Sequence, residues 1–156
     1  KVLPAIQAAV ARGVELVGDI ELFARALPPG QRVLAVTGSN GKSTVSALTG
    51  ELVRAAGLSA AVIGNIGEPV LDALAEHEDG TRWPDVFVLE LSSFQLETTT
   101  GLRPIAATVL NVTENHLDRY SGIDDYAAAR MLPGSRVAAR SCSRLTSSRS
   151  SANITR

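Results

Sequence analysis

Residues 32–44 read RVLAVTGSNGKST, and this stretch decides the fold of the chain. Its first five residues are mostly apolar, as in a short buried strand, and residues 42–56 have the pattern of a helix. Between them lies a turn with glycines at positions 38 and 41. Such a turn directs backbone N–H groups inward, and the helix N-terminus adds its positive dipole end. The stretch therefore predicts a phosphate-binding loop.

The Lys-Ser pair at the end of the loop has the chemistry to hold a nucleotide. Lys42 can reach the β- and γ-phosphates, and the Ser43 hydroxyl can ligate Mg²⁺. The standard phosphate loop needs a glycine at position 36, where this chain has Val, so the loop is shorter here. The alternative is an ordinary turn with an exposed lysine. We expect ATP and Mg²⁺ as cofactors, with candidate phosphate-binding residues Gly38, Ser39, Asn40, Gly41, Lys42, Ser43 and Thr44.

Composition excludes several functional classes. A chain of 156 residues with 45% hydrophobic content suits one α/β domain with a core. A net charge of −1 argues against a nucleic-acid partner, and no apolar run has the length of a membrane span. Cys142 is the single cysteine, so no intrachain disulfide can form, which suits a reducing compartment. We expect a cytoplasmic monomer and, since the first residue is Lys1, a piece of a longer protein.

Charge and turn residues divide the chain into three predicted parts. Residues 1–130 hold 10 Lys+Arg and 16 Asp+Glu, whereas residues 131–156 hold five Arg, seven Ser and no acid. Pro28-Pro29-Gly30 predicts a boundary, so residues 1–30 form one part and residues 31–130 the next. Within the first part we expect helices at 4–12 and 19–27, with Asp19 as the N-cap of the second. A short strand is expected at 14–17.

From residue 31 onward, strand and helix patterns alternate. The predicted strands are apolar nearly throughout, as in the centre of a parallel sheet covered on both faces, and they lie at 33–37, 60–63, 86–91 and 107–112. The predicted helices lie at 42–56, 68–77 and near 94–100. This alternation predicts an α/β fold with a truncated, doubly wound, mainly parallel sheet. Ligands of such sheets bind at the carboxyl ends of the strands.

Each predicted strand ends in polar residues suited to a binding site. The first ends in the phosphate loop, the second in GNIG at 64–67, the third in ELSS at 90–93 and the fourth in NVTENH at 111–116. Glu90 closes an apolar strand, a position from which an acid serves Mg²⁺ in nucleotide-binding sheets, although it could also cap the next turn. His116 could bind a cation or a phosphate, but a lone loop histidine is more often structural. Asn65 could orient a substrate by hydrogen bonding, but its spacing alone favours a residue in a left-handed turn.

Four segments together resemble the D-glutamate-adding members of the ATP-dependent Mur ligase family of peptidoglycan synthesis. They are TGSNGKST at 37–44, GNIG at 64–67, VLELSSFQLE at 88–97 and LNVTENHLDRY at 110–120. The resemblance covers residues 4–130. The loop is shared by sister ligases and folylpolyglutamate synthases, and the LSSFQLE run points to D-glutamate addition. The segment GDIELF at 18–23 resembles the end of the family's N-terminal, UDP-substrate-binding domain.

The resemblance implies a reaction and a set of residues that perform it. ATP would phosphorylate the carboxylate of UDP-N-acetylmuramoyl-L-alanine, and the amine of D-glutamate would displace phosphate from the acyl phosphate. The implied catalytic residues are Lys42 and His116. The implied Mg²⁺ ligands are Ser43, Glu90 and His116. Substrate contacts are implied for Asn65, Ser92 and His116.

The chain departs from the family pattern at its far end. Arg130 stands where the family has a lysine that is carbamylated to help bind a second Mg²⁺, and a guanidinium cannot form that carbamate. Asn115 stands where the family usually has Asp. We hypothesise that residues 131–156 are a frameshifted end; the alternative is a basic tail that binds an acidic surface. We therefore expect this chain to be an inactive fragment of the ligase or a non-catalytic nucleotide-binding fragment. A different phosphate-loop ATPase is the remaining alternative.

Overall fold

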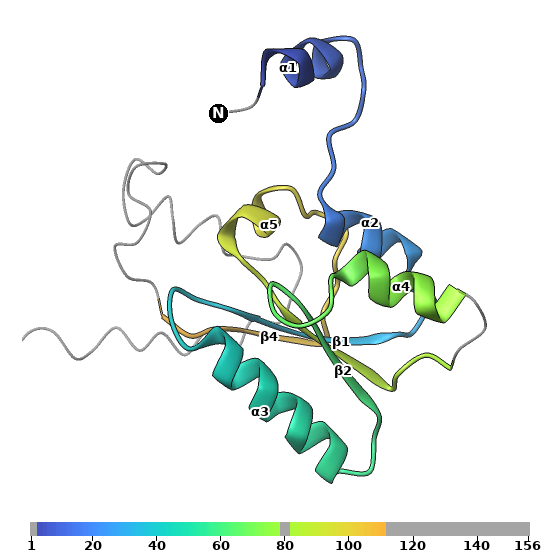
Figure 1. Ribbon diagram of the computed structural model, residues 1–156, viewed down its shortest axis with the longest axis vertical. Helices are drawn as coiled ribbons and strands as arrows, with labels where there is room; N and C mark the ends of the chain where they lie inside the picture. The colour runs from blue at the N-terminus through green and yellow to red at the C-terminus, as the bar shows by residue number, and fades with distance from the viewer. Residues whose placement is uncertain (1–2, 79–81, 112–156) are drawn as a thin grey trace, which may run out of the picture.

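The computed structural model describes residues 3–78 and 82–111, and these residues form a parallel sheet covered by helices (Figure 1). The strands are β1 (Arg32–Thr37), β2 (Ala60–Gly64), β3 (Val86–Glu90) and β4 (Ala106–Val109). The helices are α1 (Pro4–Ala11), α2 (Asp19–Ala26), α3 (Lys42–Ala55), α4 (Val70–Glu78) and α5 (Ser93–Glu97). Predictions for His116, Asn115, Arg130 and residues 131–156 lie outside the described residues.

The sheet has the order β2-β3-β1-β4, and all its pairings are parallel. Central strand β3 pairs with β2 on one side and β1 on the other, and all five of its residues are buried. The uninterrupted apolar run that predicts a strand covered on both faces is therefore confirmed. Because every strand runs the same way, the carboxyl ends of all four meet at one edge of the sheet.

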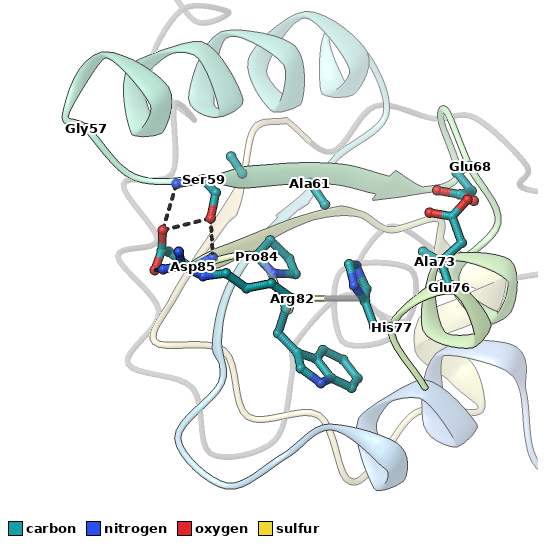
Figure 2. Close-up of a pocket in the computed structure, with 12 residues that line it drawn as sticks. Gly57, Ser59, Ala61, Glu68, Ala73, Glu76, His77, Arg82, Pro84 and Asp85 are labelled. Carbon is teal, nitrogen blue, oxygen red and sulfur yellow. Dashed lines mark hydrogen bonds and ion pairs between the residues drawn. The ribbon is translucent and has the colours of Figure 1, made fainter. Parts of the chain in front are cut away.

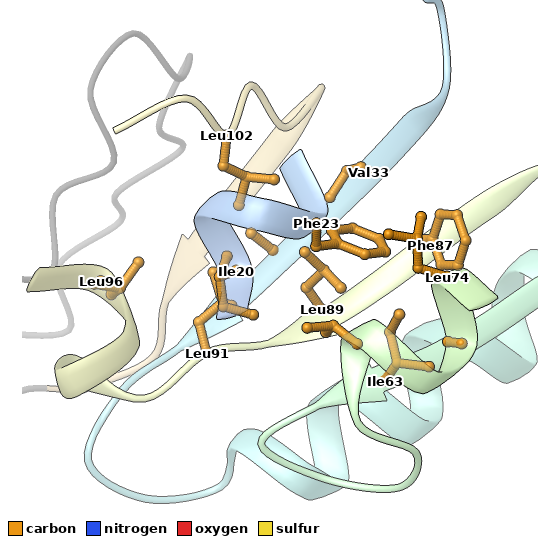
Figure 3. Packing of buried hydrophobic residues seen from close by; sticks show 13 residues of the cluster. Ile20, Phe23, Val33, Ile63, Leu74, Phe87, Leu89, Leu91, Leu96 and Leu102 are labelled. Carbon is orange, nitrogen blue, oxygen red and sulfur yellow. The ribbon is translucent and has the colours of Figure 1, made fainter. Parts of the chain in front are cut away.

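Helices cover both faces of the sheet, as a doubly wound fold requires. In Figure 1, α3 lies along one face, whereas α2, α4 and α5 lie on the other, and α1 stands away from the sheet. The main core fills the second face, where Phe23 of α2 meets Phe87 of β3 edge to face with ring centroids 5.2 Å apart (Figure 3). Its other large members are Ile20, Val33, Ile63, Leu74, Leu89, Leu91, Leu96 and Leu102. The α/β fold class is confirmed.

Several predicted boundaries were wrong for local reasons. Residues 14–17 form no strand, since they pair with none of the described strands. Gly18, not Asp19, is the N-cap of α2, and Asp19 is the first helical residue. Helix α4 begins at Val70 rather than Glu68, because Glu68 bridges Ile63 and accepts a hydrogen bond from the N–H of Gly64.

Buried Glu21 ties the segment before the sheet to the turn before β4. Its carboxylate accepts hydrogen bonds from the backbone N–H of Gly101 at 2.7 Å and of Thr100 at 2.8 Å, and from Arg25 Nε at 2.9 Å. The side chain of Arg25 also pairs with Glu15. The N–H groups of Gly101 and Thr100, followed by Arg25, lower the pKa of Glu21 to about 2. Sequence reasoning did not identify this contact.

The Glu21 contact predicts an acid-sensitive contribution to stability. A folded-state pKa below the usual 4.5 means that the stabilisation is complete above 4.5 and is lost as the pH falls toward about 2. Glu21→Gln should therefore lower the free energy of unfolding by about 2 kcal/mol at neutral pH. The difference from the wild type should shrink as the pH falls from 5 to 2.5. Urea unfolding followed by circular dichroism across this range measures it.

Glu76→Gln is the matched control, because Glu76 is an exposed carboxylate on α4. This change should leave both the stability and its pH dependence close to those of the wild type. A Glu21→Gln variant whose deficit stays constant from pH 7 to pH 2.5 would contradict the assigned role of the Glu21 carboxylate.

Candidate phosphate and cation site

The loop between β1 and α3 has the backbone geometry of an anion-binding turn. Gly41 has φ 82°, in the left-handed region, and it is the N-cap of α3 without a side-chain cap. The first turn of α3 therefore presents backbone N–H groups that have no partner within the helix. With the helix dipole behind them, these groups suit a phosphate.

Lys42 places its positive charge over this loop. Its Nζ donates to the carbonyl oxygens of Gly38 at 3.0 Å and of Ser39 at 3.3 Å, and the side chain is half-buried. These bonds hold the ammonium group against the loop rather than in open solvent. The two neighbouring candidates on α3, Ser43 and Thr44, are exposed in its first turn. The structure thus groups the predicted phosphate-binding residues in one place.

Glu90 ends β3 with a carboxylate that is only half satisfied. The residue is 2% exposed, and its Oε1 accepts a hydrogen bond from Asn65 Nδ2 at 3.0 Å. Its Oε2 is buried and has no hydrogen-bond partner within the described part of the chain. A buried carboxylate oxygen without a partner is costly, and a divalent cation is one ligand that would satisfy it.

The residues at this edge fit Mg²⁺. Glu90 and Ser43 would hold the ion, which would neutralise charge on the phosphates. The hydroxyls of Thr37 and Ser46 are also buried without a partner among the described residues. Residues 3–78 and 82–111 contain no group of three or more His, Cys, Asp or Glu side chains that could hold a metal.

The turn after β2 is locked against Glu90. The Asn65 N–H donates to the Glu90 carbonyl oxygen at 2.9 Å, in addition to the side-chain bond between the two residues. Gly64 has φ 111°, and a Cβ there would lie 2.5 Å from the Glu90 carbonyl oxygen, so only glycine allows this approach. The structure thus gives Asn65 a role in orienting Glu90. Its contact with a substrate stays a prediction.

Ser92 caps the helix that follows Glu90. Its hydroxyl accepts from the Gln95 N–H at 3.3 Å, and Gln95 Oε1 accepts from the Ser92 N–H at 3.1 Å, which together form a capping box. Gln95 Nε2 also donates to Asp19 of α2 at 3.1 Å. The LSSFQLE run therefore fixes α5 against α2, while the substrate contact predicted for Ser92 stays a prediction.

The cavity in Figure 2, of about 540 Å³, is separate from this site. Ser59 and Asp85 line it just before β2 and β3, at the amino edge, and Ser59 N and Oγ both donate to Asp85 at 2.8 and 2.7 Å. These bonds lower the pKa of Asp85. His77 stacks on Trp83 with ring centroids 5.2 Å apart. Because ligands of parallel sheets bind at the carboxyl edge, we expect the nucleotide there rather than in this cavity.

The family assignment agrees with this geometry. A family model described as the Mur ligase middle domain matches residues 36–142. The chain belongs to the Mur ligase middle-domain family. The match begins in β1 and includes the phosphate loop, Asn65 and Glu90, so the carboxyl-edge site lies within the family's domain. It also includes Arg130 and the first part of the Ser/Arg-rich segment.

Curated relatives and solved structures support the same assignment. The chain is 58% identical over 131 residues to the UDP-N-acetylmuramoylalanine–D-glutamate ligase of Nitrosomonas europaea, covering 81% of this chain and 28% of the relative. The ligase of the same name from Vibrio vulnificus is 54% identical over 128 residues, covering 82% and 27%. This Mur ligase middle domain therefore spans little more than a quarter of the length of either relative.

Two solved structures share the fold. The structure of UDP-N-acetylmuramoyl-L-alanyl-D-glutamate–2,6-diaminopimelate ligase matches with a TM-score of 0.51 and 32% identity, over 63% of this chain and 23% of the other. FolC of E. coli, solved with DHPP and ADP, matches with a TM-score of 0.52 and 19% identity, over 72% and 38%. The second likeness shows the fold alone. The predicted Mur ligase family is confirmed.

The unpartnered oxygen of Glu90 predicts opposite effects on stability and on Mg²⁺ response. Glu90→Gln should raise the free energy of unfolding of the ligand-free chain by about 1 kcal/mol, because a neutral amide is easier to bury than a carboxylate. The same change should remove most of the rise in melting temperature that Mg²⁺ with ATP gives the wild type. Differential scanning fluorimetry with and without Mg²⁺ and ATP measures both effects.

The exposed carboxylate of Glu76 again supplies the control, and Glu76→Gln should change neither quantity. Retention of the full Mg²⁺-dependent rise in Glu90→Gln would show that this carboxylate does not hold the ion.

Proposed function

We propose that this chain binds ATP with Mg²⁺ as the central part of a ligase that joins D-glutamate to UDP-N-acetylmuramoyl-L-alanine in peptidoglycan synthesis. The observation that carries the proposal is the carboxyl edge of the sheet. There Lys42 Nζ bonds to the glycine-rich turn after β1, and Glu90, at the end of the neighbouring strand β3, has a buried oxygen without a partner among the described residues. The names of the relatives supply the substrates. We further propose that the protein is cytoplasmic and monomeric. Among the described helices, none is long and apolar enough to cross a bilayer.

The proposed chemistry has two steps. A carboxylate oxygen of the UDP-linked alanine attacks the γ-phosphorus of ATP, ADP leaves, and an acyl phosphate forms. The amine of D-glutamate then attacks the acyl carbon, loses a proton, and inorganic phosphate leaves as the amide forms. Charge moves onto phosphate oxygens in the first step, so fixed positive groups are the main requirement.

Different residues are proposed to bind the phosphates, the metal ion and the substrate. The amides at the N-terminus of α3 and the ammonium group of Lys42 would bind the phosphates and balance their charge. Ser43 and Glu90 would hold Mg²⁺, and Asn65 keeps the Glu90 carboxylate oriented. Asn65 and Ser92 are proposed to contact the substrate. His116, which lies outside the described residues, is proposed to contact the substrate and to serve catalysis and a second ion.

We propose that this chain alone does not complete the reaction. Arg130 stands at the position of the carbamylated lysine that the resemblance implies, and the match covers only 28% of the Nitrosomonas europaea relative. The Ser/Arg-rich residues 131–156 are proposed to arise from a frameshift, which sequencing of the coding DNA tests: an alternative frame should restore a lysine at position 130. If the chain shows no turnover, non-catalytic binding of a nucleotide is the function that remains for it.

Binding of MgATP to the 156-residue chain tests the nucleotide function. Isothermal titration should show one site in the wild type, and Lys42→Ala should weaken it by at least about tenfold, since a charged partner of the phosphates is lost. Arg54→Ala is the control, because Arg54 lies in the last turn of α3 and pairs with Glu51 at 2.7 Å. Equal affinity in the Lys42→Ala variant would contradict the proposed loop function.

A phosphate-release assay tests the proposed inactivity of the chain. With MgATP, UDP-N-acetylmuramoyl-L-alanine and D-glutamate, the chain should release no phosphate above its ATP-only background. Substrate-dependent release would show that the chain carries the whole catalytic machinery.

A further inference from the structure

We propose that Asn111 is a positioning residue that fixes the phosphate loop and thereby selects which loop amides face the phosphates. The inference rests on the proposed nucleotide function and extends it. Asn111 lies two residues beyond the end of β4, across from the tip of the loop after β1. The sequence analysis places Asn111 at the start of the polar run at 111–116 but assigns it no role of its own.

Three hydrogen bonds join Asn111 to the loop. The Ser39 N–H donates to the Asn111 carbonyl oxygen at 2.9 Å. The Asn40 N–H donates to Asn111 Oδ1 at 2.8 Å, and Asn111 Nδ2 donates to the Asn40 carbonyl oxygen at 2.9 Å. The side-chain amide thus pairs with the backbone of one residue in the manner of a neighbouring strand.

An amide side chain suits this pairing because it carries its donor and its acceptor on separate atoms. The Asn40 backbone offers a donor and an acceptor, and its partner must return one of each. Aspartate has no donor when ionised, and alanine has neither group. A longer glutamine would start from the same Cα and overreach, because the backbone of Asn111 is already bonded to Ser39.

The loop and β4 approach too closely for the pairing to be incidental. The Leu110 N–H donates to the Thr37 carbonyl oxygen at 2.9 Å, so the β1–β4 pairing continues into the loop. A Cβ on Gly38 would lie 3.0 Å from Leu110 Cβ and 3.2 Å from the Asn111 N. Gly38 therefore permits the contact that Asn111 completes.

Because of this pairing, the backbone amides of the loop have two different roles. The N–H groups of Ser39 and Asn40 are used by Asn111 and hold the loop to the sheet. The N–H groups of residues 41–44, at the start of α3, remain to bind phosphate. Without the Asn111 side chain the Asn40 amide would be released, and the nucleotide would have to order this part of the loop, which weakens binding.

The variant Asn111→Ala removes both side-chain bonds and tests the inference. In the ligand-free 156-residue chain, the Asn40 amide should exchange with solvent at least about tenfold faster by NMR. The dissociation constant for MgATP should rise by roughly tenfold, as expected for two lost neutral hydrogen bonds. The variant Asn111→Asp keeps the acceptor for the Asn40 N–H, so that amide should stay protected while MgATP affinity falls.

The matched control is Gln31→Ala at the opposite edge of the sheet. Gln31 Nε2 donates to the Pro84 carbonyl oxygen at 2.8 Å, which joins the segments that precede β1 and β3. Gln31→Ala should lower the melting temperature about as much as Asn111→Ala does. It should nevertheless keep the wild-type affinity for MgATP. The comparison separates a general loss of stability from a loss of loop order.

Three outcomes decide the inference. Faster Asn40 exchange with weaker MgATP binding in Asn111→Ala, and unchanged binding in Gln31→Ala, supports it. Normal binding by the wild type and by Asn111→Ala overturns the inference alone. Absence of MgATP binding by the wild-type chain overturns the proposed function and the inference with it.

Discussion

The parallel pairing of β3 between β2 and β1 is the constraint on which the site depends. The register sets Glu90 beside Val36, the residue before the end of β1, and beside Gly64, the last residue of β2. Loops that are far apart in the sequence therefore meet around one carboxylate. A shift of either pairing by one residue would turn Glu90 away and place an apolar side chain at the edge.

At the same edge of the sheet, a residue proposed to bind a ligand lowers the stability of the ligand-free domain. Glu90 is buried with one oxygen unpartnered among the described residues, which costs free energy in the ligand-free state. The core on the α2 face and the buried Glu21 contact stabilise the fold against that cost. Asn65 and Asn111 use amide groups to hold the two loops at the edge. The domain thus keeps a charged site ordered before any ligand binds.

Sequence alone could predict the strands, the loop and the acid at the end of β3, because each depends on local pattern and neighbouring residues. The glycines at 38 and 41 and the apolar run before Glu90 are signals of this kind. The Glu21, Asn65 and Asn111 contacts could not be predicted, since each joins residues at least 25 positions apart through one side chain. No local sequence pattern identifies which distant residues form such contacts. The strand expected at 14–17 failed because a strand requires a partner, which a local pattern does not supply.

Mapping of backbone amide shifts by NMR during titration of the chain with MgADP tests the central claim most directly. The account predicts that the largest shifts fall at the carboxyl edge, in residues 41–44, Asn65 and Glu90. The cavity around Ser59 and Trp83 at the amino edge should stay unchanged. Shifts concentrated around that cavity, with the loop after β1 unaffected, would contradict the assignment of the carboxyl edge as the nucleotide site.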